Sequence, residues 1–245
     1  MSYFLDEETG RHPTGKKPAL QVAPIHGVLP YDGCRNPMTR STVSSRVSAT
    51  FALPATNGVP KVFHFESKSE FAVALDALLD PSVFGLEVQL PPVRYWCRTS
   101  QKRRSHHFDM RLTFDDGLRR AVFVRNGDSL SKRKTQDEIE DIFNAIPEDF
   151  ADEAIVVNGD HFTRAYRDNL RRIWEASAEE DADADERLEE AARTTNYWLL
   201  QDLIKKSDLR SPRAFGAALR LLGRRILRAD WHAVIGVHSR IELNA

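Results

Sequence analysis

The chain has 245 residues, and its 35 lysine and arginine residues nearly balance its 36 aspartate and glutamate residues. This length allows one large domain or two small ones, and the balance of charge excludes a uniformly basic or acidic protein. No apolar run approaches the roughly 18 residues of a membrane span, the acidic N-terminus is unlike a secretory signal, and Cys34 and Cys97 fit no metal spacing. We therefore expect a cytoplasmic protein with reduced cysteines and no membrane span.

The first segments predict an N-terminal arm, a β-hairpin and a helix. Residues 1–42 show no periodicity and predict a flexible arm. The alternating segments SRVSATFALP and VPKVFHFES lie on either side of Asn57-Gly58, and Asn-Gly is the strongest short signal for a hairpin. The next segment, SKSEFAVALDALLD, has helical spacing, with Ser67 or Ser69 as its cap and a stop at Asp80-Pro81.

The middle of the chain predicts a mixed α/β domain with a central sheet. Residues 83–97 indicate a strand pair or one bent strand, and residues 106–126 indicate two antiparallel strands joined at Asp115-Asp116-Gly117. Residues 98–107, RTSQKRRSHH, predict an exposed loop between strands. A helix, a short buried strand and a further helix follow, over 135–146, 153–159 and 164–176. Helices that alternate with strands in this order are typical of a sheet flanked by helices.

The segment 178–190 is strongly acidic, with eight acidic residues and one basic residue. Such a run is typical of a solvated linker or of an exposed extension of a helix, and we predict an acidic linker over 178–192. The alternative is an acidic mimic of DNA that covers a binding face.

The remaining residues, 193–245, predict a small basic domain. They contain ten lysine and arginine residues against four acidic residues. Two short helices are indicated, the second starting at Ser211-Pro212 and ending near Gly223, and a β-like segment follows. A basic helix-turn-helix followed by strands is typical of a winged helix that contacts DNA, here with Arg213 and Arg220 as candidate contacts.

The first part of the chain contains acidic residues at the spacing of a metal-dependent nuclease. Phosphodiester hydrolysis needs an activated water and a neutralised leaving oxygen, and Mg²⁺ held by carboxylates provides both. One common arrangement combines a glutamate on a helix, an aspartate on a strand, and an acidic or amide residue two positions before a lysine on the next strand. Glu70, Asp109, Phe123 and Arg125 occupy the four corresponding places.

Simpler interpretations of these residues remain open. Glu70 could be an ordinary surface residue of its helix, and Asp109 could be a structural acid paired with Arg111 or Arg94. The basic side chains in the loop before Asp109 could be merely exposed, or they could hold a phosphate backbone. These four candidates for nucleic-acid binding are Arg98, Lys102, Arg103 and Arg104.

From about Arg40 to Asn244 the chain resembles the TnsA-like endonucleases, the subunits of heteromeric transposases that cut one strand at the transposon end. The resemblance lies in the order and spacing of several segments. These are FESKSEF (65–71), DPSVFGLEVQLP (80–91), HHFDMRLTFDDG (106–117) and AIVVNGDHFTRAYRDNLRRIW (154–174).

The resemblance implies a restriction-endonuclease-like nuclease domain over 43–177 and a winged helix after the linker. It also implies Mg²⁺-dependent nicking, with Mn²⁺ as a substitute, in transposition and DNA recombination. The partners would be double-stranded DNA, a transposase subunit and an ATPase regulator. The family's catalytic Glu and Asp fall on Glu70 and Asp109, which would be both catalytic and metal-binding, and its Lys falls on Arg125.

Two departures from the family pattern bear on activity. Arginine is always protonated and presents a planar fork, so Arg125 is not equivalent to the family's lysine, although it could stabilise charge on a phosphate. Phe123 cannot bind a metal or a water. Three hypotheses follow: an altered but active nuclease, a catalytically silent module that binds DNA or docks a transposase, and a nuclease of the same fold acting in repair or phage defence.

Overall fold

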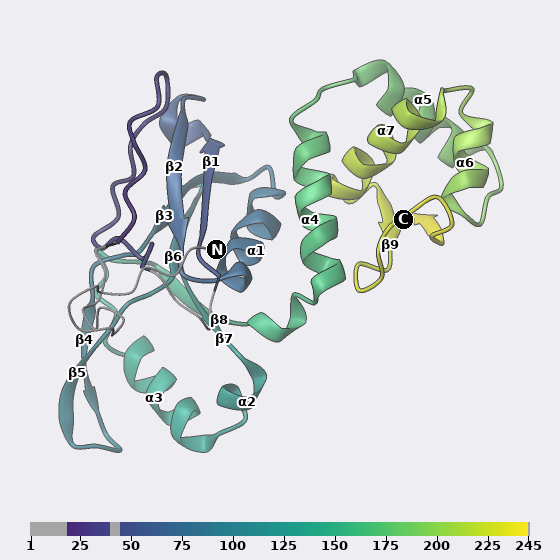
Figure 1. The fold of residues 1–245 in the computed structure, drawn as a ribbon. Helices are drawn as coiled ribbons and strands as arrows, with labels where there is room; N and C mark the ends of the chain where they lie inside the picture. Colours follow the sequence, from purple (N-terminus) through teal and green to yellow (C-terminus); the bar gives the residue numbers. More distant parts are fainter. Residues whose placement is uncertain (1–18, 40–44, 245) are drawn as a thin grey trace, which may run out of the picture.

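The computed structural model describes residues 19–39 and 45–244. A sheet with its helices forms one part, a helical bundle with a small strand pair forms the other, and α4 lies between them (Figure 1). Among the described residues, no helix is both long enough and apolar enough to cross a membrane. The predicted mixed α/β class is confirmed, with a multi-stranded sheet flanked by helices.

The elements follow one another in an order close to the prediction. The strands are β1 (Val47–Ala52), β2 (Pro60–Phe65), β3 (Val83–Val88), β4 (Val93–Cys97), β5 (Lys102–His106), β6 (Met110–Phe114), β7 (Arg119–Arg125), β8 (Glu153–Asn158), β9 (Leu227–Ala229) and β10 (Ile241–Leu243). The α-helices are α1 (Lys68–Leu78), α2 (Gly127–Leu130), α3 (Arg133–Phe143), α4 (Arg164–Ser177), α5 (Ala182–Thr194), α6 (Leu200–Lys206) and α7 (Ser211–Gly223). Two short 3-10 helices are η1 (Pro54–Thr56) and η2 (Gly159–His161).

A four-stranded sheet in the order β3-β6-β7-β8 forms the centre of the first part. Strands β3, β6 and β7 are antiparallel neighbours, whereas β8 runs parallel to β7. Both faces of β7 are covered, because Val122 packs into the core that includes α1 and Phe123 packs into a second core that includes α3. Successive side chains on a strand point to opposite faces, so one strand contributes to both cores.

The predicted hairpin is present, with β1 antiparallel to β2 and Asn57 and Gly58 in the left-handed region of φ at its turn. Part of the predicted N-terminal arm, residues 19–39, lies along this hairpin in the described structure, and Leu29 forms a bridge with Lys61 (Figure 1). The rest of the arm falls at residues 1–18 and 40–44, outside the described residues.

The expected loop at 98–107 contains a strand. β5 pairs antiparallel with β4, and the turn between them spans 98–101. All of the burial in this hairpin is on β4, where Val93, Tyr95 and Cys97 are buried, whereas β5 is exposed along almost its whole length. An exposed basic strand has no alternation of apolar and polar residues, so its sequence could not be distinguished from a loop.

The acidic segment also differs from the expected linker, because most of it forms α5. Ala184, Leu188, Ala191 and Ala192 are buried at helical spacing, and the Asp181 side chain caps the helix by accepting a bond from the Ala184 amide at 3.2 Å. This apolar stripe consists mainly of alanine and lies between acidic residues in the sequence, so the sequence pattern did not indicate a buried face.

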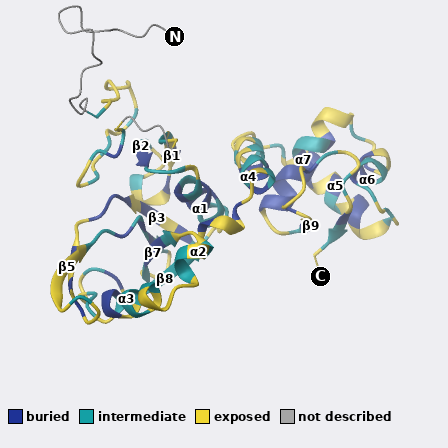
Figure 2. Ribbon diagram, turned by 60° about the horizontal axis from the view of Figure 1, so that its bottom comes forward, coloured by how far each residue is buried: buried dark blue, intermediate teal, exposed yellow. Residues whose placement is uncertain are grey.

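After α5, the chain forms α6, α7 and the antiparallel pair β9–β10, as predicted for a helix pair followed by strands. Helix α7 is buried along most of its length (Figure 2). Helix α4 contacts both α1 and α7, and one apolar core extends from Phe51 on β1 to Ile241 on β10. The division into domains at 43–177 and 193–245 stays a prediction.

One buried amide side chain holds the loop between β9 and β10 against α4. Asn169 is fully buried; its amide nitrogen donates to the carbonyls of Trp231 at 3.1 Å and Ala233 at 2.8 Å, and its oxygen accepts from the Ile235 amide at 3.0 Å. Three backbone groups of one loop thus depend on a single side chain, and the bonds to Trp231 and Ile235 are buried.

We expect Asn169→Ala to lower the free energy of unfolding by about 3 kcal/mol, because it leaves buried backbone groups without partners. Urea unfolding followed by circular dichroism measures this change. The matched control is Asn196→Ala, at an exposed position on the same part of the chain. Equal stability of the two variants would contradict the role given to Asn169.

Candidate active site

The predicted acidic residues meet at one edge of the sheet. Glu70 lies in the first turn of α1, and Asp109 immediately precedes β6 beside the end of β7. The backbone of Asp109 continues the ladder on both sides, because its amide donates to Val122 and its carbonyl accepts from Gln89. The negative charge of Glu70 is the second largest influence on the pKa of Asp109, after burial, so the two carboxylates lie within electrostatic reach of each other.

Glu70 is held in place by the start of its own helix. Ser67 is the N-cap and accepts a bond from the Glu70 amide at 3.1 Å, as expected for serine at this position. The Glu70 carboxylate accepts in return from the Ser67 hydroxyl at 3.0 Å and from the Glu66 amide at 2.9 Å. Glu70 is only 8% exposed, and burial raises the pKa of its carboxyl above the usual range. It is therefore a buried acid, not an ordinary surface residue.

Asp109 is bound by the backbone of the neighbouring strand. Its Oδ2 atom accepts from the Val124 amide at 2.7 Å. The alternative pairing with Arg111 does not occur, because Arg111 binds both carboxylate oxygens of Glu87, at 2.7 and 2.8 Å. Burial, with the negative charges of Glu70 and Glu66, raises the pKa of Asp109 to about 7. Without a cation, ionisation of both acids at this edge is costly.

The end of β7 contributes an aromatic and a cationic side chain. Phe123 is buried and packs against His106 at 4.2 Å between ring centroids. The Arg125 guanidinium lies 4.6 Å from the centre of the Phe123 ring, and its charge tends to lower the pKa values of both Asp109 and His106. Burial is the main cause that lowers the pKa of His106, to about 4. Phe123 thus supports the Arg125 side chain at the end of β7, and the charge of Arg125 is the smallest of the influences on the pKa of Asp109. The family pattern has a polar residue at the position of Phe123.

Gln89 is a candidate ligand that was not among the site residues predicted from the sequence. It is 1% exposed, and neither polar atom of its side chain has a partner among the described residues. The backbone of Gln89 has a φ of 53°, in the left-handed region, and its backbone amide donates to the backbone carbonyl of Asp109 at 3.3 Å. Buried amides are rarely left unpaired, so this side chain is a candidate ligand at the edge occupied by Asp109. The signal in the sequence was the position of Gln89 in DPSVFGLEVQLP (80–91), one of the segments that resemble the family.

The donor set suits a hard cation. Magnesium takes oxygen ligands, retains several waters and is often held by one or two carboxylates together with substrate phosphates. Glu70 and Asp109 supply the carboxylates, and the unpartnered amide of Gln89 is a neutral oxygen donor nearby in the sheet. Within the described ranges, no group of three or more His, Cys, Asp or Glu side chains could hold a metal ion. A site at this edge would therefore rest on two carboxylates.

The predicted nucleic-acid contacts lie on two separate surfaces, and several of them form ion pairs with acidic residues of the protein. On the β4–β5 hairpin, Arg98 binds Glu140 and Asp141, and Arg104 binds Glu138 at 3.1 Å. Lys102 and Arg103 on the same hairpin are exposed and have no ion-pair partner among the described residues. These two remain the available cations of that surface.

In the C-terminal part, both candidate contacts belong to the interface between α5 and α7. Arg213 binds Asp181 at 2.6 Å and Asp183 at 2.7 Å. Arg220 is buried and binds Asp185 at 2.7 Å. The acidic residues at the start of α5 therefore neutralise both arginines. Arg220 forms an ion pair between α7 and α5 instead of facing a ligand.

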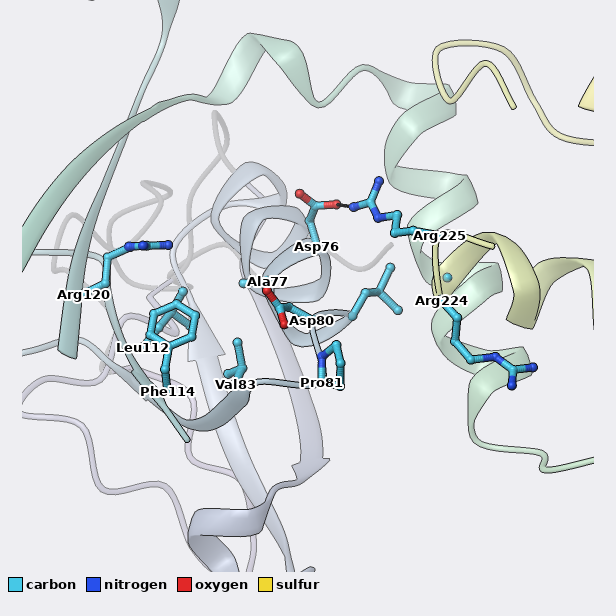
Figure 3. A pocket seen from close by; sticks show the side chains of 12 residues that line it. Asp76, Ala77, Asp80, Pro81, Val83, Leu112, Phe114, Arg120, Arg224 and Arg225 are labelled. Carbon is cyan, nitrogen blue, oxygen red and sulfur yellow. Dashed lines mark hydrogen bonds and ion pairs between the residues drawn. The ribbon is translucent and has the colours of Figure 1, made fainter. Parts of the chain in front are cut away.

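A cavity with a volume of about 740 Å³ lies at the opposite end of the sheet, at the junction between α1 and the C-terminal part (Figure 3). Its charged side chains are engaged with one another or with neighbours: Arg225 binds Asp76 at 3.1 Å, Arg224 binds Asp185, and Arg120 binds Glu153. We therefore place the candidate chemistry at the acidic edge.

Comparison with protein-family models found no match, and comparison with curated proteins found none. The resemblance to TnsA-like endonucleases stays a prediction that rests on the motifs of the sequence.

The raised pKa of Asp109 predicts how stability depends on pH in metal-free protein. The folded state holds a proton on Asp109 up to about pH 7, whereas the unfolded state releases it near 3.8, so stability falls as pH rises through this window. Asp109→Asn removes this loss and should be more stable than wild type at pH 8 by roughly 4 kcal/mol, but similar at pH 4. Urea unfolding in EDTA measures both values.

The control for this comparison is Asp116→Asn, in the exposed turn between β6 and β7. Its stability should follow that of wild type across the pH range. A gain at pH 8 as large as that of Asp109→Asn would show that the effect does not belong to the acidic edge.

Proposed function

We propose that this protein is a metal-dependent DNA endonuclease that nicks one strand, acting as the cutting subunit of a heteromeric transposase. The observation that supports it best is the meeting of a helix-borne Glu70 and a strand-borne Asp109 at one edge of the sheet. The spacing predicted from the sequence and the electrostatic proximity in the structure agree. Two buried acids with raised pKa values, one of which raises the pKa of the other, are typical of a cation-binding or catalytic site.

The arrangement of strands supports a restriction-endonuclease-like core. An antiparallel β3-β6-β7 meander that ends in a parallel β8, with α1 on one face and α3 on the other, brings the start of β6 and the end of β7 to the same edge. In the C-terminal part, the succession α5, α6, α7 and β9–β10 agrees with a winged helix. There the exposed Lys205 and Arg210 have no acidic partner among the described residues and could contact DNA in place of Arg213 and Arg220.

The residues have separate roles in the proposed reaction. Glu70 and Asp109 would hold Mg²⁺, or Mn²⁺ in its place, and Gln89 could add a neutral ligand. When bound, the ion would lower the pKa of a water and stabilise charge on the leaving oxygen. Arg125, supported by the Phe123 ring, would donate hydrogen bonds to the scissile phosphate. Being always protonated, Arg125 cannot act as a base, so proton removal is left to the carboxylates or to solvent.

The second candidate is a catalytically silent module that binds DNA or docks a transposase. It is favoured by two observations: Phe123 is a buried apolar residue at a position where the family has a polar one, and both Glu70 oxygens already accept protein hydrogen bonds. A role with a transposase or an ATPase regulator rests on the resemblance alone. A nuclease of the same fold in repair or phage defence would use the same residues.

Nicking of supercoiled plasmid in Mg²⁺ or Mn²⁺ tests the proposed activity. We expect wild type to produce open circles and Asp109→Ala and Glu70→Ala to produce none, because each removes a carboxylate of the ion site. A gel shift on the same DNA measures binding separately. Binding without nicking in wild type would support the silent module, and loss of both would contradict a role with DNA.

Arg125→Ala should lower the nicking rate by about a hundredfold, as expected when one positioned donor to the phosphate is removed. Arg125→Lys keeps the charge and should retain more activity than alanine. The control is Arg193→Ala, which removes an exposed arginine from α5. Equal rates for Arg125→Ala and wild type would exclude Arg125 from the site.

Binding of the ion can be measured without DNA cleavage. We expect Mg²⁺ at pH 8 to raise the melting temperature of wild type, because the cation relieves the repulsion between Glu70 and Asp109. Asp109→Asn, which lacks one charge, should show a smaller rise. The same rise in both proteins would place the cation elsewhere.

A further inference from the structure

A groove between α1 and α4 carries a concentration of positive charge that the sequence analysis did not single out. The two helices contact each other and lie side by side in both views of the molecule (Figures 1 and 2). The cavity between them has a volume of about 520 Å³. Its floor is apolar, and its charged residues come from the first turn of α1 and from one face of α4. The charged side chains that line it are Lys68, Arg164, Arg167, Asp168 and Arg171.

The cations of this groove have fewer acidic partners than most of the DNA contacts predicted from the sequence. Among the described residues, Lys68 and Arg164 have no ion-pair partner, and Arg167 donates to the Phe162 carbonyl at 3.0 Å instead of to an acid. Arg171 has only a long, exposed pair with Glu175, at 3.6 Å. With four cations and one acid, Asp168, the charges that line the groove sum to +3. The rest of α4 adds no net negative charge to offset the +3 of the groove. In contrast, the acidic residues at the start of α5 neutralise Arg213 and Arg220.

The position of the groove connects the two surfaces of the proposed function. Lys68 and Glu70 both lie in the first turn of α1, so the groove begins at the same end of this helix as the acidic edge, although the two side chains lie on different faces of the helix. The other wall, α4, packs against α7 and continues towards the C-terminal part. A linear anion that leaves the acidic edge along this groove would be led to the C-terminal part.

The spacing of the cations suits a phosphate backbone. Arg164, Arg167 and Arg171 follow at intervals of three and four residues, so they share one face of α4. Seven residues of helix span about 10 Å, which corresponds to about three phosphates of one strand at about 3.4 Å each along a duplex axis. Arginine is also suited to this partner, since its planar fork can bind a phosphate through two parallel hydrogen bonds.

From this charge, spacing and position we infer that the α1–α4 groove binds the phosphate backbone of duplex DNA between the acidic edge and the C-terminal part. The inference rests on the proposed function and extends it, because it identifies where the flank of the cut site lies. The contacts are to phosphates, so they position the duplex without reading its sequence.

The salt dependence of DNA binding tests this inference. Fluorescence anisotropy with a labelled duplex, in EDTA to prevent cleavage, gives the binding constant between 50 and 200 mM salt, a range in which phosphate contacts dominate affinity. We expect Arg164→Ala/Arg171→Ala to bind more weakly and to reduce the slope of log K against log salt by about 1.8, from about 0.9 for each lost phosphate contact. Arg164→Lys/Arg171→Lys should retain most of the slope.

The matched control is Arg187→Ala/Arg193→Ala, which removes the same number of exposed arginines from α5. Circular dichroism verifies that all variants are folded. If the groove variant keeps the wild-type slope, or if the control changes as much, the groove is not a DNA contact, while nicking that depends on Asp109 would leave the proposed function intact. If wild type binds no duplex at all, the proposed function and this inference both fail.

Discussion

The mutual repulsion of two carboxylates at the edge of the sheet is the constraint on which the organisation of the candidate site depends. Glu70 and Asp109 are each held by short hydrogen bonds, Glu70 through the cap of its own helix and Asp109 through the backbone of β7. Neither can move away from the other without breaking these bonds. Above about pH 7, where Asp109 ionises, a positive charge stabilises this arrangement, and Arg125 supplies part of it from the neighbouring strand.

Positive charge is used in two ways in this molecule. In the C-terminal part, the first turn of α5 binds Arg213 and Arg220, so these arginines join α5 to α7 and stabilise the packing of the bundle. Along α4, the arginines face a groove with little acidic compensation and are available to an external anion. The same residue type therefore serves structure on one helix and, in our inference, DNA on another.

Much of the fold could be predicted because its elements have strong local signals. Asn57-Gly58 predicted the first hairpin, and Ser67 or Ser69 the start of α1, whose cap is Ser67 in the structure. The interpretation failed where a local signal was masked: β5 is exposed along almost its whole length and has no buried alternation, and the apolar stripe of α5 is mostly alanine between acids. β5 is stabilised by pairing with the neighbouring strand β4, and α5 by packing against α7, which lies farther along the chain.

By itself, the sequence determined the succession of helices and strands and the acidic residues worth testing, since periodicity, caps and motif spacing are local properties. Only the tertiary structure decided which charges are neutralised, because ion pairs such as Arg220–Asp185 join residues far apart in the chain. It also decided that Gln89 is buried without a partner and that Lys68 and Arg164 line one groove. The physical reason is that solvation and Coulomb energy depend on distance in space, which sequence separation does not report.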